Sequence, residues 1–394
     1  MSIQLDKFLS RELHELHEKG LYRPLRVLEG QQLPQARFDG RMVVNLSSNN
    51  YLGLNTHPAL VRAAVEATER FGVGSGAVRT IAGTMKLHVE LEERIAQFKN
   101  VEACVVFQSG FAANAGTVSA ILGKGDLIIS DELNHASIID GCRLSRAEIR
   151  VFPHKDTDAL EKILSETHAL PGKKLVITDG VFSMEGDIAP LPRIVELAER
   201  YGAIMMVDDA DASGVLGKCG RGTIDHFGLH GRVDIQVGTL SKAIGALGGY
   251  VCGSRNLIEF LSHRARPFLL STSHPPAVAA TCIAAFGILE KEPQWIERLW
   301  KNTRFFKAGL DRLGFNTGFS ETPINPVIMG RGDLAMSFAD ELFKEGVFAQ
   351  GIGYPTVPES KSRIRTIVTA THSREQLQYA LDVMERVAKR QGIL

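Results

Sequence analysis

Five apolar runs, each followed at once by polar residues, constrain the fold of this 394-residue chain more than any other feature. The runs are rich in β-branched residues and are separated by stretches with helical spacing of apolar residues, such as 194–201. Continuously apolar strands that alternate with helices are typical of a mostly parallel sheet covered by helices on both faces. We therefore predict an α/β fold with strands at residues 103–107, 127–129, 175–178, 204–207 and 233–237.

Polar clusters directly follow these runs, at residues 108–114, 131–137, 179–187, 208–213 and 239–242. Ligands of open α/β sheets bind beyond the carboxyl ends of the strands, where such clusters lie side by side. We therefore expect one ligand site built from several of these clusters.

Lys242 is the first candidate for chemistry at that site. It follows the run 233–237 among hydroxyls and glycines and has few opposite charges near it in the sequence. Desolvation of such a lysine lowers its pKa, so that the neutral amine can attack a carbonyl or hold an aldehyde cofactor as a Schiff base. The alternative is an ordinary surface lysine after a buried strand; the coincidence of polar clusters at strand ends argues for the functional role.

The positions of glycines indicate which chemical groups the ligand contains. Gly110 lies where a strand turns into a helix, so the backbone can approach a ligand closely and the helix amides suit a phosphate. The glycine-rich loop at residues 72–80 lacks the GxGxxG and GxxxxGK[ST] patterns. Neither a dinucleotide nor a nucleoside triphosphate site is therefore supported.

Composition narrows the functional class. Lysine plus arginine and aspartate plus glutamate are both 45, which argues against a binder of nucleic acid or anionic membrane. No apolar run approaches the ~20 residues that span a bilayer, and the N-terminus lacks the order of a signal peptide, so we expect a cytoplasmic protein. The five cysteines form no CxxC pair, so we expect neither a disulfide framework nor a metal site.

Three segments are expected along the chain. Residues 1–45 would form an amphipathic helix over 3–19 and a connecting arm, and residues 46–288 would form the large domain. The pattern of predicted elements changes in residues 289–394. Short strands at 328–329, 347–349 and 364–368 alternate there with helices at 336–345 and 374–390. We interpret this last segment as a smaller α+β domain.

The order and spacing of these clusters resemble the α-oxoamine synthases, fold-type I enzymes that use pyridoxal 5′-phosphate (PLP) to condense an amino acid with an acyl-CoA thioester. Residues 48–53, 131–137, 178–184 and 363–365 carry the resemblance, which covers nearly the whole chain. The pattern is most similar to glycine C-acetyltransferases, which implies condensation of glycine with acetyl-CoA to 2-amino-3-oxobutanoate. The alternatives are condensation of alanine with a pimeloyl thioester to 8-amino-7-oxononanoate, with loss of carbon dioxide, and a broad-specificity synthase.

The resemblance implies a role for each catalytic candidate. Lys242 would form the Schiff base and later remove the α-proton of the amino acid. Asp208 would pair with the pyridinium nitrogen and keep it protonated, which makes the ring an electron sink. His135 would stack on the cofactor ring; a core histidine is the alternative.

The remaining roles carried over are contacts to cofactor and substrates. The cofactor contacts would be Gly110, Phe111, Ser183, Thr239 and Ser241, joined by Thr272 and Ser273 from the neighbouring subunit of a homodimer. Arg365 would bind the amino-acid carboxylate through its planar fork. Asn49, Arg23 and Thr356 would contact the substrates.

One position departs from the family. The chain reads Asp208-Asp209-Ala210-Asp211, where the family usually has a histidine at the last position that donates to the cofactor's phenolic oxygen. An ionised Asp211 has no proton to donate, whereas burial and neighbouring carboxylates would raise its pKa. Asp211 would therefore face the cofactor in its neutral form, or turn away from it.

Two rival functions remain open. A PLP aminotransferase would transfer the amino group without CoA. A catalytically impaired partner subunit would keep the fold and bind an active chain, a reading that the residue Asp211 supports and the retention of Lys242, His135 and Arg365 opposes.

Overall fold

The computed structural model describes residues 3–19, 22, 24–354 and 356–394. These fall into two compact units. The first, here called the sheet unit, comprises Asn49–Ser183 and Asp187–Arg298. The second, the terminal unit, comprises Met1–Ser48, Met184–Gly186 and Leu299–Leu394.

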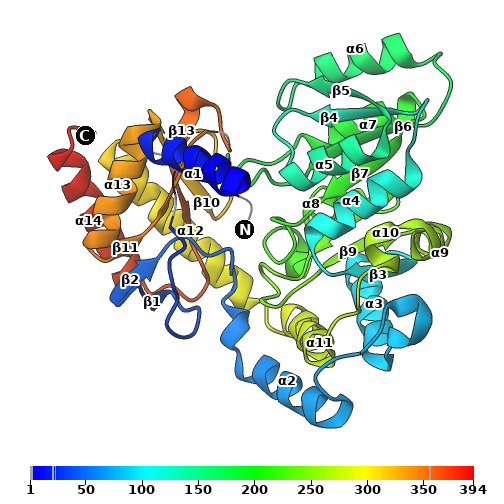
Figure 1. Ribbon diagram of the computed structural model, residues 1–394, viewed down its shortest axis with the longest axis horizontal. Helices are drawn as coiled ribbons and strands as arrows, with labels where there is room; N and C mark the ends of the chain where they lie inside the picture. The colour runs from blue at the N-terminus through cyan, green and yellow to red at the C-terminus, as the bar shows by residue number, and fades with distance from the viewer. Residues whose placement is uncertain (1–2, 20–21, 23, 355) are drawn as a thin grey trace. The chain divides into compact units, whose positions relative to one another are not determined.

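A seven-stranded sheet organises the sheet unit, in the order β3-β9-β8-β7-β6-β4-β5. All strands run parallel except β9, which is antiparallel to both of its neighbours. The predicted strands are present, and two further strands, β5 and β9, join them (Figure 1). The strands are β3 (Ala103–Phe107), β4 (Leu127–Asp131), β5 (Glu148–Phe152), β6 (Lys174–Asp179), β7 (Ile204–Asp208), β8 (Ile235–Thr239) and β9 (Gly249–Gly253).

Side chains that alternate along the strands pack into two apolar cores, one on each face of the sheet. In β4, Ile128 packs into one core, while Leu127 and Ile129 pack into the other. This alternation explains the continuously apolar strands, because both faces are covered by helices. The first face is covered by α4 (Gly110–Ile121), α5 (Ala136–Ser145), α9 (Arg255–Arg264) and α10 (Arg266–Leu269), and the second by α6 (Thr157–Thr167), α7 (Leu191–Arg200) and α8 (Thr223–His226).

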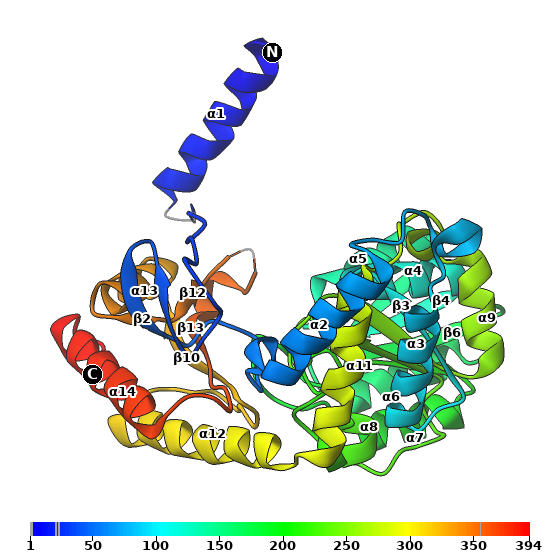
Figure 2. The same ribbon diagram turned by 90° about the horizontal axis from the view of Figure 1, so that it is seen from below.

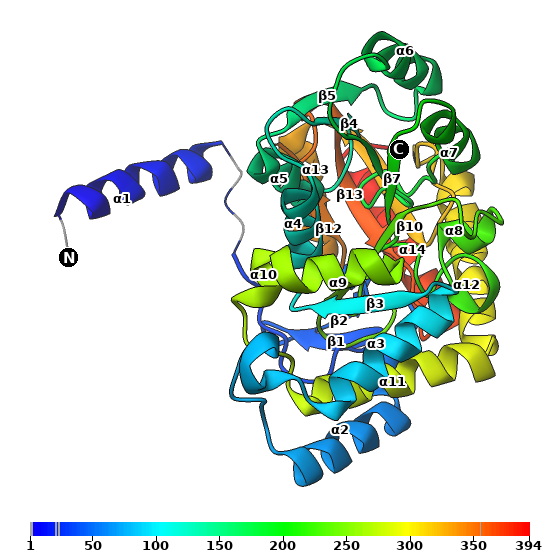
Figure 3. The same ribbon diagram turned by 90° about the vertical axis from the view of Figure 1, so that its right-hand side faces the viewer.

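A third group of helices lies along the β3 and β9 side. Helix α11 (Pro276–Lys291) lies between α2 (Pro58–Phe71) and α3 (Lys86–Lys99), as Figure 2 shows. Figure 3 shows β3 with α9 and α10 on one side and α3 on the other. Helices therefore cover both faces of the sheet, whereas the edge strand β5 remains largely exposed.

The terminal unit is built from segments at both ends of the sequence. Parallel pairing of β2 with β11 joins the N-terminal segment to the C-terminal part. The predicted division at residues 45 and 288 treats the N-terminal arm as separate, whereas this strand pairing places it in the terminal unit. The elements are α1 (Ile3–Glu18), β1 (Gln35–Phe38), β2 (Arg41–Asn45), α12 (Gln294–Leu313, from Leu299 on), β10 (Ile324–Gly330), α13 (Gly332–Lys344), β11 (Val347–Phe348), β12 (Gln350–Ile352), β13 (Ser362–Ile367) and α14 (Arg374–Arg390).

The predicted amphipathic helix and final helix are both present. Helix α1 buries none of its residues, so its apolar face, which includes Phe8 and Leu13, is exposed. Helix α14 matches the predicted range 374–390 and packs Leu377, Leu381 and Met384 into the core of the terminal unit. Among the residues described, no helix is both long enough and apolar enough to cross a membrane.

A buried ion pair links α3 to the segment after β7. Lys99 Nζ lies 3.0 Å from Asp209 Oδ2 and 2.6 Å from the carbonyl oxygen of Arg221. The side chains of Lys99 and Asp209 are 1% and 0% exposed. Thr223 also donates to Asp209 through its backbone amide and its hydroxyl. This pair fixes the residues on either side of Asp209 relative to the sheet.

We predict that Lys99→Met lowers the free energy of unfolding by about 3 kcal/mol, because it leaves Asp209 buried without its cation. Urea unfolding followed by circular dichroism measures the change. Lys86→Met is the matched control, since Lys86 begins the same helix and its side chain is 75% exposed. Equal midpoints for the two variants would contradict the prediction.

Candidate active site

The carboxyl ends of the parallel strands bring the predicted polar clusters together within the sheet unit. Asp179, Asp208 and Thr239 are the last residues of β6, β7 and β8, which are adjacent in the sheet. The register pairs Asp179 with Asp208 directly. Functional side chains from three neighbouring strands therefore lie at one edge.

Lys242 lies in the turn between β8 and β9 and forms an ion pair. Its Nζ is 2.5 Å from Asp211 Oδ2, and the Lys242 side chain is 20% exposed. Few opposite charges lie near Lys242 in the sequence, but the fold brings one of them into contact with it. The reason is spatial: Asp211 lies three residues beyond the end of β7, and β7 and β8 are neighbours in the sheet.

Tyr51 holds the other oxygen of the same carboxylate. Its hydroxyl donates to Asp211 Oδ1 at 2.7 Å, and both residues are buried. Asp211 therefore does not turn away from the site. Two donors, one of them a lysine, suit an ionised carboxylate better than the neutral form that the sequence suggested.

Asp208 is buried at the end of its strand and is well supplied with donors. Asn114 Nδ2 lies 2.6 Å from Asp208 Oδ2, and the amide of Ala210 lies 2.9 Å from Oδ1. Burial raises the pKa of Asp208, and the hydrogen bond from Asn114 opposes that rise. The carboxylate is thus held in one orientation, as pairing with a ring nitrogen requires.

Asp179, beside Asp208, anchors the loop of His135. The backbone amide of His135 donates to Asp179 Oδ2 at 2.7 Å. Burial and the nearby charge of Asp208 raise the pKa of Asp179 well above its usual range. His135 itself precedes α5, and its ring is exposed, with Nδ1 2.7 Å from Ser137 Oγ. An exposed ring is free to lie against a ligand.

The N-terminus of α4 and two hydroxyls form a place for an anion. Ser109 caps the helix by accepting from the amide of Ala112 at 3.1 Å. The first amides of a helix have no acceptors within it, and here these are the amides of Gly110 and Phe111. A side chain at Gly110 would approach Thr239 Cβ to 3.6 Å. Because the Thr239 hydroxyl donates to the Gly248 carbonyl at 2.8 Å, it accepts from the Ser241 hydroxyl, also at 2.8 Å. Free amides beside hydroxyls suit a phosphate.

Four other predicted contacts lie in the same unit. Asn49 Nδ2 is 3.5 Å from the hydroxyl of Tyr51, which links Asn49 to the Asp211 pair. Ser183 is half-buried in the segment after β6. Ser273 is buried, and its hydroxyl lies 2.6 Å from the Gly83 carbonyl oxygen. Thr272 is exposed and bridges to Val78.

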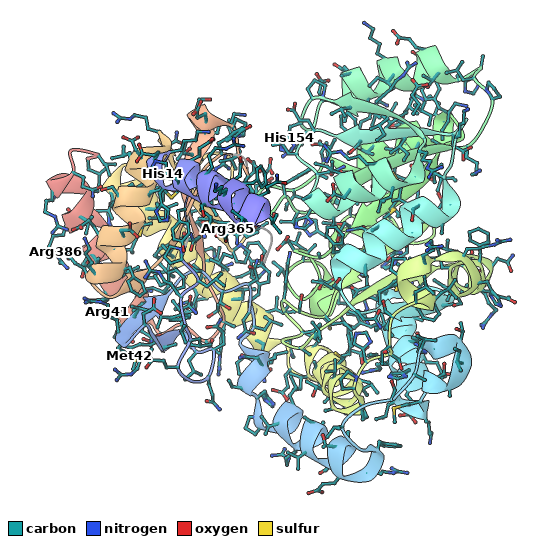
Figure 4. All side chains as sticks on the ribbon, in the orientation of Figure 1. His14, Arg41, Met42, His154, Arg365 and Arg386 are labelled. Carbon is teal, nitrogen blue, oxygen red and sulfur yellow. The ribbon has the colours of Figure 1, made fainter. Side chains whose placement is uncertain are left out.

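Two of the other predicted substrate contacts lie in the terminal unit. Arg365 is half-buried on β13 of the terminal unit (Figure 4), and Thr356 is exposed in the same unit. Arg23 lies outside the described residues.

The donor set of the sheet unit fits PLP. An amine (Lys242) suits its aldehyde, a buried carboxylate (Asp208) its ring nitrogen, and an exposed imidazole (His135) its ring face. The amides before α4, with Thr239 and Ser241, suit its phosphate. No metal-ligating cluster of three or more His, Cys, Asp or Glu occurs among the residues described.

Comparison with known proteins agrees with this geometry. Residues 41–384 match the model of the family described as aminotransferase class I and II. The chain belongs to this family. It is 60% identical over 390 residues to an 8-amino-7-oxononanoate synthase of Symbiobacterium thermophilum, covering 99% of this chain and 100% of the relative. It is 54% identical over 388 residues to 8-amino-7-oxononanoate synthase 1 of Bacillus subtilis, covering 98% and 99%.

Two solved structures are similar to this chain over nearly its whole length. A serine palmitoyltransferase variant from S. paucimobilis with a bound PLP–myriocin aldimine superimposes with a TM-score of 0.94 at 32% identity, over 100% of both chains. An 8-amino-7-oxononanoate synthase from Francisella tularensis superimposes with a TM-score of 0.76 at 28% identity, over 89% of this chain and 99% of that one. The predicted fold-type I architecture and the α-oxoamine synthase resemblance are confirmed. The relatives from Symbiobacterium thermophilum and Bacillus subtilis both carry the name 8-amino-7-oxononanoate synthase, not glycine C-acetyltransferase.

Some residues that the structure places at the site had no predicted role: Tyr51, Asn114, Ser137 and Asp179. All four lie in the polar clusters at strand ends or in the segments that carry the family resemblance. Asn114 is the clearest missed signal, because it is a large polar residue in the first turns of an otherwise small and apolar helix.

His154 joins the two loops that follow β4 and β6. Its Nδ1 lies 3.0 Å from Asp131 Oδ1 and its Nε2 3.0 Å from Asp187 Oδ2, with Lys155 Nζ also 3.1 Å from Asp187 Oδ2 (Figure 4). Burial alone would lower the pKa of His154, but its hydrogen bonds to the two carboxylates raise it to about 9. The charged imidazole therefore ties the start of the His135 loop to the end of the Ser183 segment.

We predict that this contribution to stability is lost at alkaline pH. The pKa of His154 in the folded state, about 9, exceeds the ordinary histidine value of 6.5, so the contribution is complete below pH 6.5 and disappears as pH rises through 9. The stability difference between the parent and His154→Gln should fall from at most about 3 kcal/mol to near zero across this window. Urea unfolding at several pH values measures it, with exposed His14→Gln as the control. A difference independent of pH would contradict the charged state.

Proposed function

We propose that this chain is an 8-amino-7-oxononanoate synthase, which condenses alanine with a pimeloyl thioester and releases carbon dioxide and the thiol. The observation that carries the proposal is the placement of Lys242 and the buried Asp208 at the ends of neighbouring strands, beside the N-terminus of α4. The choice of substrates is supported by relatives of that name at 54 to 60% identity over nearly the whole chain.

PLP is the cofactor of this family, and the donor set described above suits it. When bound, it withdraws electrons from the α-carbon of the amino acid and so stabilises the negative charge needed to attack the thioester. Lys242 would hold it at the aldehyde carbon and Asp208 at the ring nitrogen. Gly110, Phe111, Thr239 and Ser241 would hold the phosphate.

The side chains of this chain then control protons and orientation. The amine of Lys242, once free, is positioned to remove the α-proton of the amino acid. Asp208, held by Asn114, favours a proton on the ring nitrogen because a buried carboxylate stabilises the charge beside it. His135 limits the ring to one plane.

Substrate contacts complete the proposal. Arg365 would bind the amino-acid carboxylate in a bidentate manner, and Asn49, Arg23 and Thr356 would contact the acyl substrate or the amino acid. The proposed assembly is a homodimer in which Thr272 and Ser273 of the partner subunit complete the phosphate site. The exposed position of Thr272 is compatible with such a contact.

Thiol release tests the proposed reaction directly. The purified chain, loaded with PLP, is supplied with pimeloyl-CoA and carboxyl-labelled alanine, or with acetyl-CoA and glycine. We expect labelled carbon dioxide and thiol in equal amounts, and a kcat/KM about 100-fold higher for the first pair. Lys242→Ala should release no thiol while keeping its circular dichroism spectrum.

Other outcomes identify the rivals. Preference for glycine and acetyl-CoA would establish glycine C-acetyltransferase instead. Turnover with a keto-acid acceptor and no thiol release would establish an aminotransferase. PLP uptake without any turnover would favour an impaired partner subunit.

Asp211 should limit cofactor binding. Its ion pair with Lys242 must be broken before the amine can hold PLP, and an ionised carboxylate repels a phenolate. We predict that Asp211→His, which can donate a hydrogen bond instead, raises PLP affinity about tenfold or more. Fluorescence titration with PLP measures this, and Tyr51→Phe, which removes only the second donor to Asp211, is the comparison. Equal PLP affinity in the parent and in Asp211→His would show that this position is not limiting.

A further inference from the structure

A single chain of hydrogen bonds connects the two residues that flank the proposed cofactor ring. Asn114 Nδ2 lies 2.6 Å from Asp208 Oδ2 and 2.9 Å from Ser137 Oγ. Ser137 Oγ in turn lies 2.7 Å from His135 Nδ1. Asn114 and Ser137 are 0% and 1% exposed, so water does not compete for these contacts.

The chemistry of the groups fixes the direction of every hydrogen bond. The opposite orientation of the Asn114 amide would set its oxygen against a carboxylate oxygen, so the nitrogen must face Asp208. Its two hydrogens go to Asp208 and to Ser137 Oγ. The backbone amide of Ser137 can only donate, and it lies 3.2 Å from His135 Nδ1, so this nitrogen is an acceptor. The single hydroxyl hydrogen of Ser137 therefore also goes to His135 Nδ1.

His135 Nδ1 therefore accepts two hydrogen bonds and carries no hydrogen. We propose that Asn114 and Ser137 are positioning residues, which together hold His135 as its Nε2–H tautomer and Asp208 in one rotamer. The inference rests on the proposed function in one respect, that His135 and Asp208 are the residues that face PLP. The new element is that the Asn114 carboxamide holds both His135 and Asp208, so that their orientations are linked.

The chain of hydrogen bonds restricts the rotation of the His135 ring. Two contacts from Ser137 to the same nitrogen fix the ring plane, although the imidazole is exposed. The Asp208 carboxylate is fixed at the same time, by Asn114 on one oxygen and Ala210 on the other. Loss of Asn114 should loosen both groups, whereas loss of the Ser137 hydroxyl should loosen only His135.

The test uses the PLP-loaded chain labelled with ¹⁵N-histidine. The nitrogen shifts of His135, assigned by their loss in His135→Gln, report which ring nitrogen carries the hydrogen. We expect the Nε2–H tautomer in the parent and a mixture of tautomers in Ser137→Ala and Asn114→Leu. Ser145→Ala and Thr117→Val are matched controls, since they alter buried residues of the same two helices outside the hydrogen-bond chain.

Kinetics give a second readout. Asn114→Leu should lower kcat by roughly tenfold to a hundredfold with little change in the KM for either substrate, because only the orientation of the ring contacts changes. Ser137→Ala should have the smaller effect.

The proposal is overturned if His135 carries its hydrogen on Nδ1 in the parent, or if its tautomer is the same in Ser137→Ala. The nitrogen shifts are read without any substrate, so they stand even if no thioester is turned over. Failure of the proposed function is therefore distinguishable from failure of this inference.

Discussion

The burial of several carboxylates at one sheet edge is the constraint on which the rest of the structure depends. Asp179, Asp208, Asp209 and Asp211 are all buried there, and burying an ionised carboxylate is costly unless donors surround it. The donors come from distant parts of the chain: Lys99 from α3, Asn114 from α4, Tyr51 from the segment before α2, and Lys242 from the turn after β8. The interactions that offset this burial are therefore the same ones that assemble the site. In the proposed reaction, the charge of Asp208 is in turn available to the cofactor ring.

The strands of the sheet could be predicted because their signal is local. Five strand-like runs were identified: the structure leaves 103–107 unchanged, extends three by one or two residues, and shifts 233–237 by two residues. Strand β5 was missed because it lies at the sheet edge and exposes most of its residues. Strand β9 begins at Gly249, a residue that is unfavourable in strands, and its antiparallel insertion between β3 and β8 has no local signature. The pairing of β2 with β11 is likewise invisible in the sequence, because its partners lie about 300 residues apart.

The candidate site residues could be proposed from the sequence, whereas their contacts could not. Lys242, Asp208 and His135 follow from the order of motifs, whereas the ion pair of Lys242 with Asp211 depends on how two loops fold over neighbouring strands. The same holds for Lys99, whose position near the end of a helix indicates nothing about a buried carboxylate. The replacement of a family histidine by Asp211 could be read from the sequence, but its partners could not. That difference decides whether the residue turns away or holds the lysine.

The terminal unit is made of three separate pieces of the chain, with Met184–Gly186 drawn from the middle of the sequence. During synthesis on the ribosome, β2 emerges early, but its partner β11 is translated only after the whole seven-stranded sheet. Strand β2 can pair with β1 at once, but it must wait for β11 while the sheet unit becomes able to fold. A ribosome that stalls before residue 347 would release a chain with a folded sheet unit in which β2 lacks its partner β11. The end of the message thus decides whether residues 1–48 complete their fold.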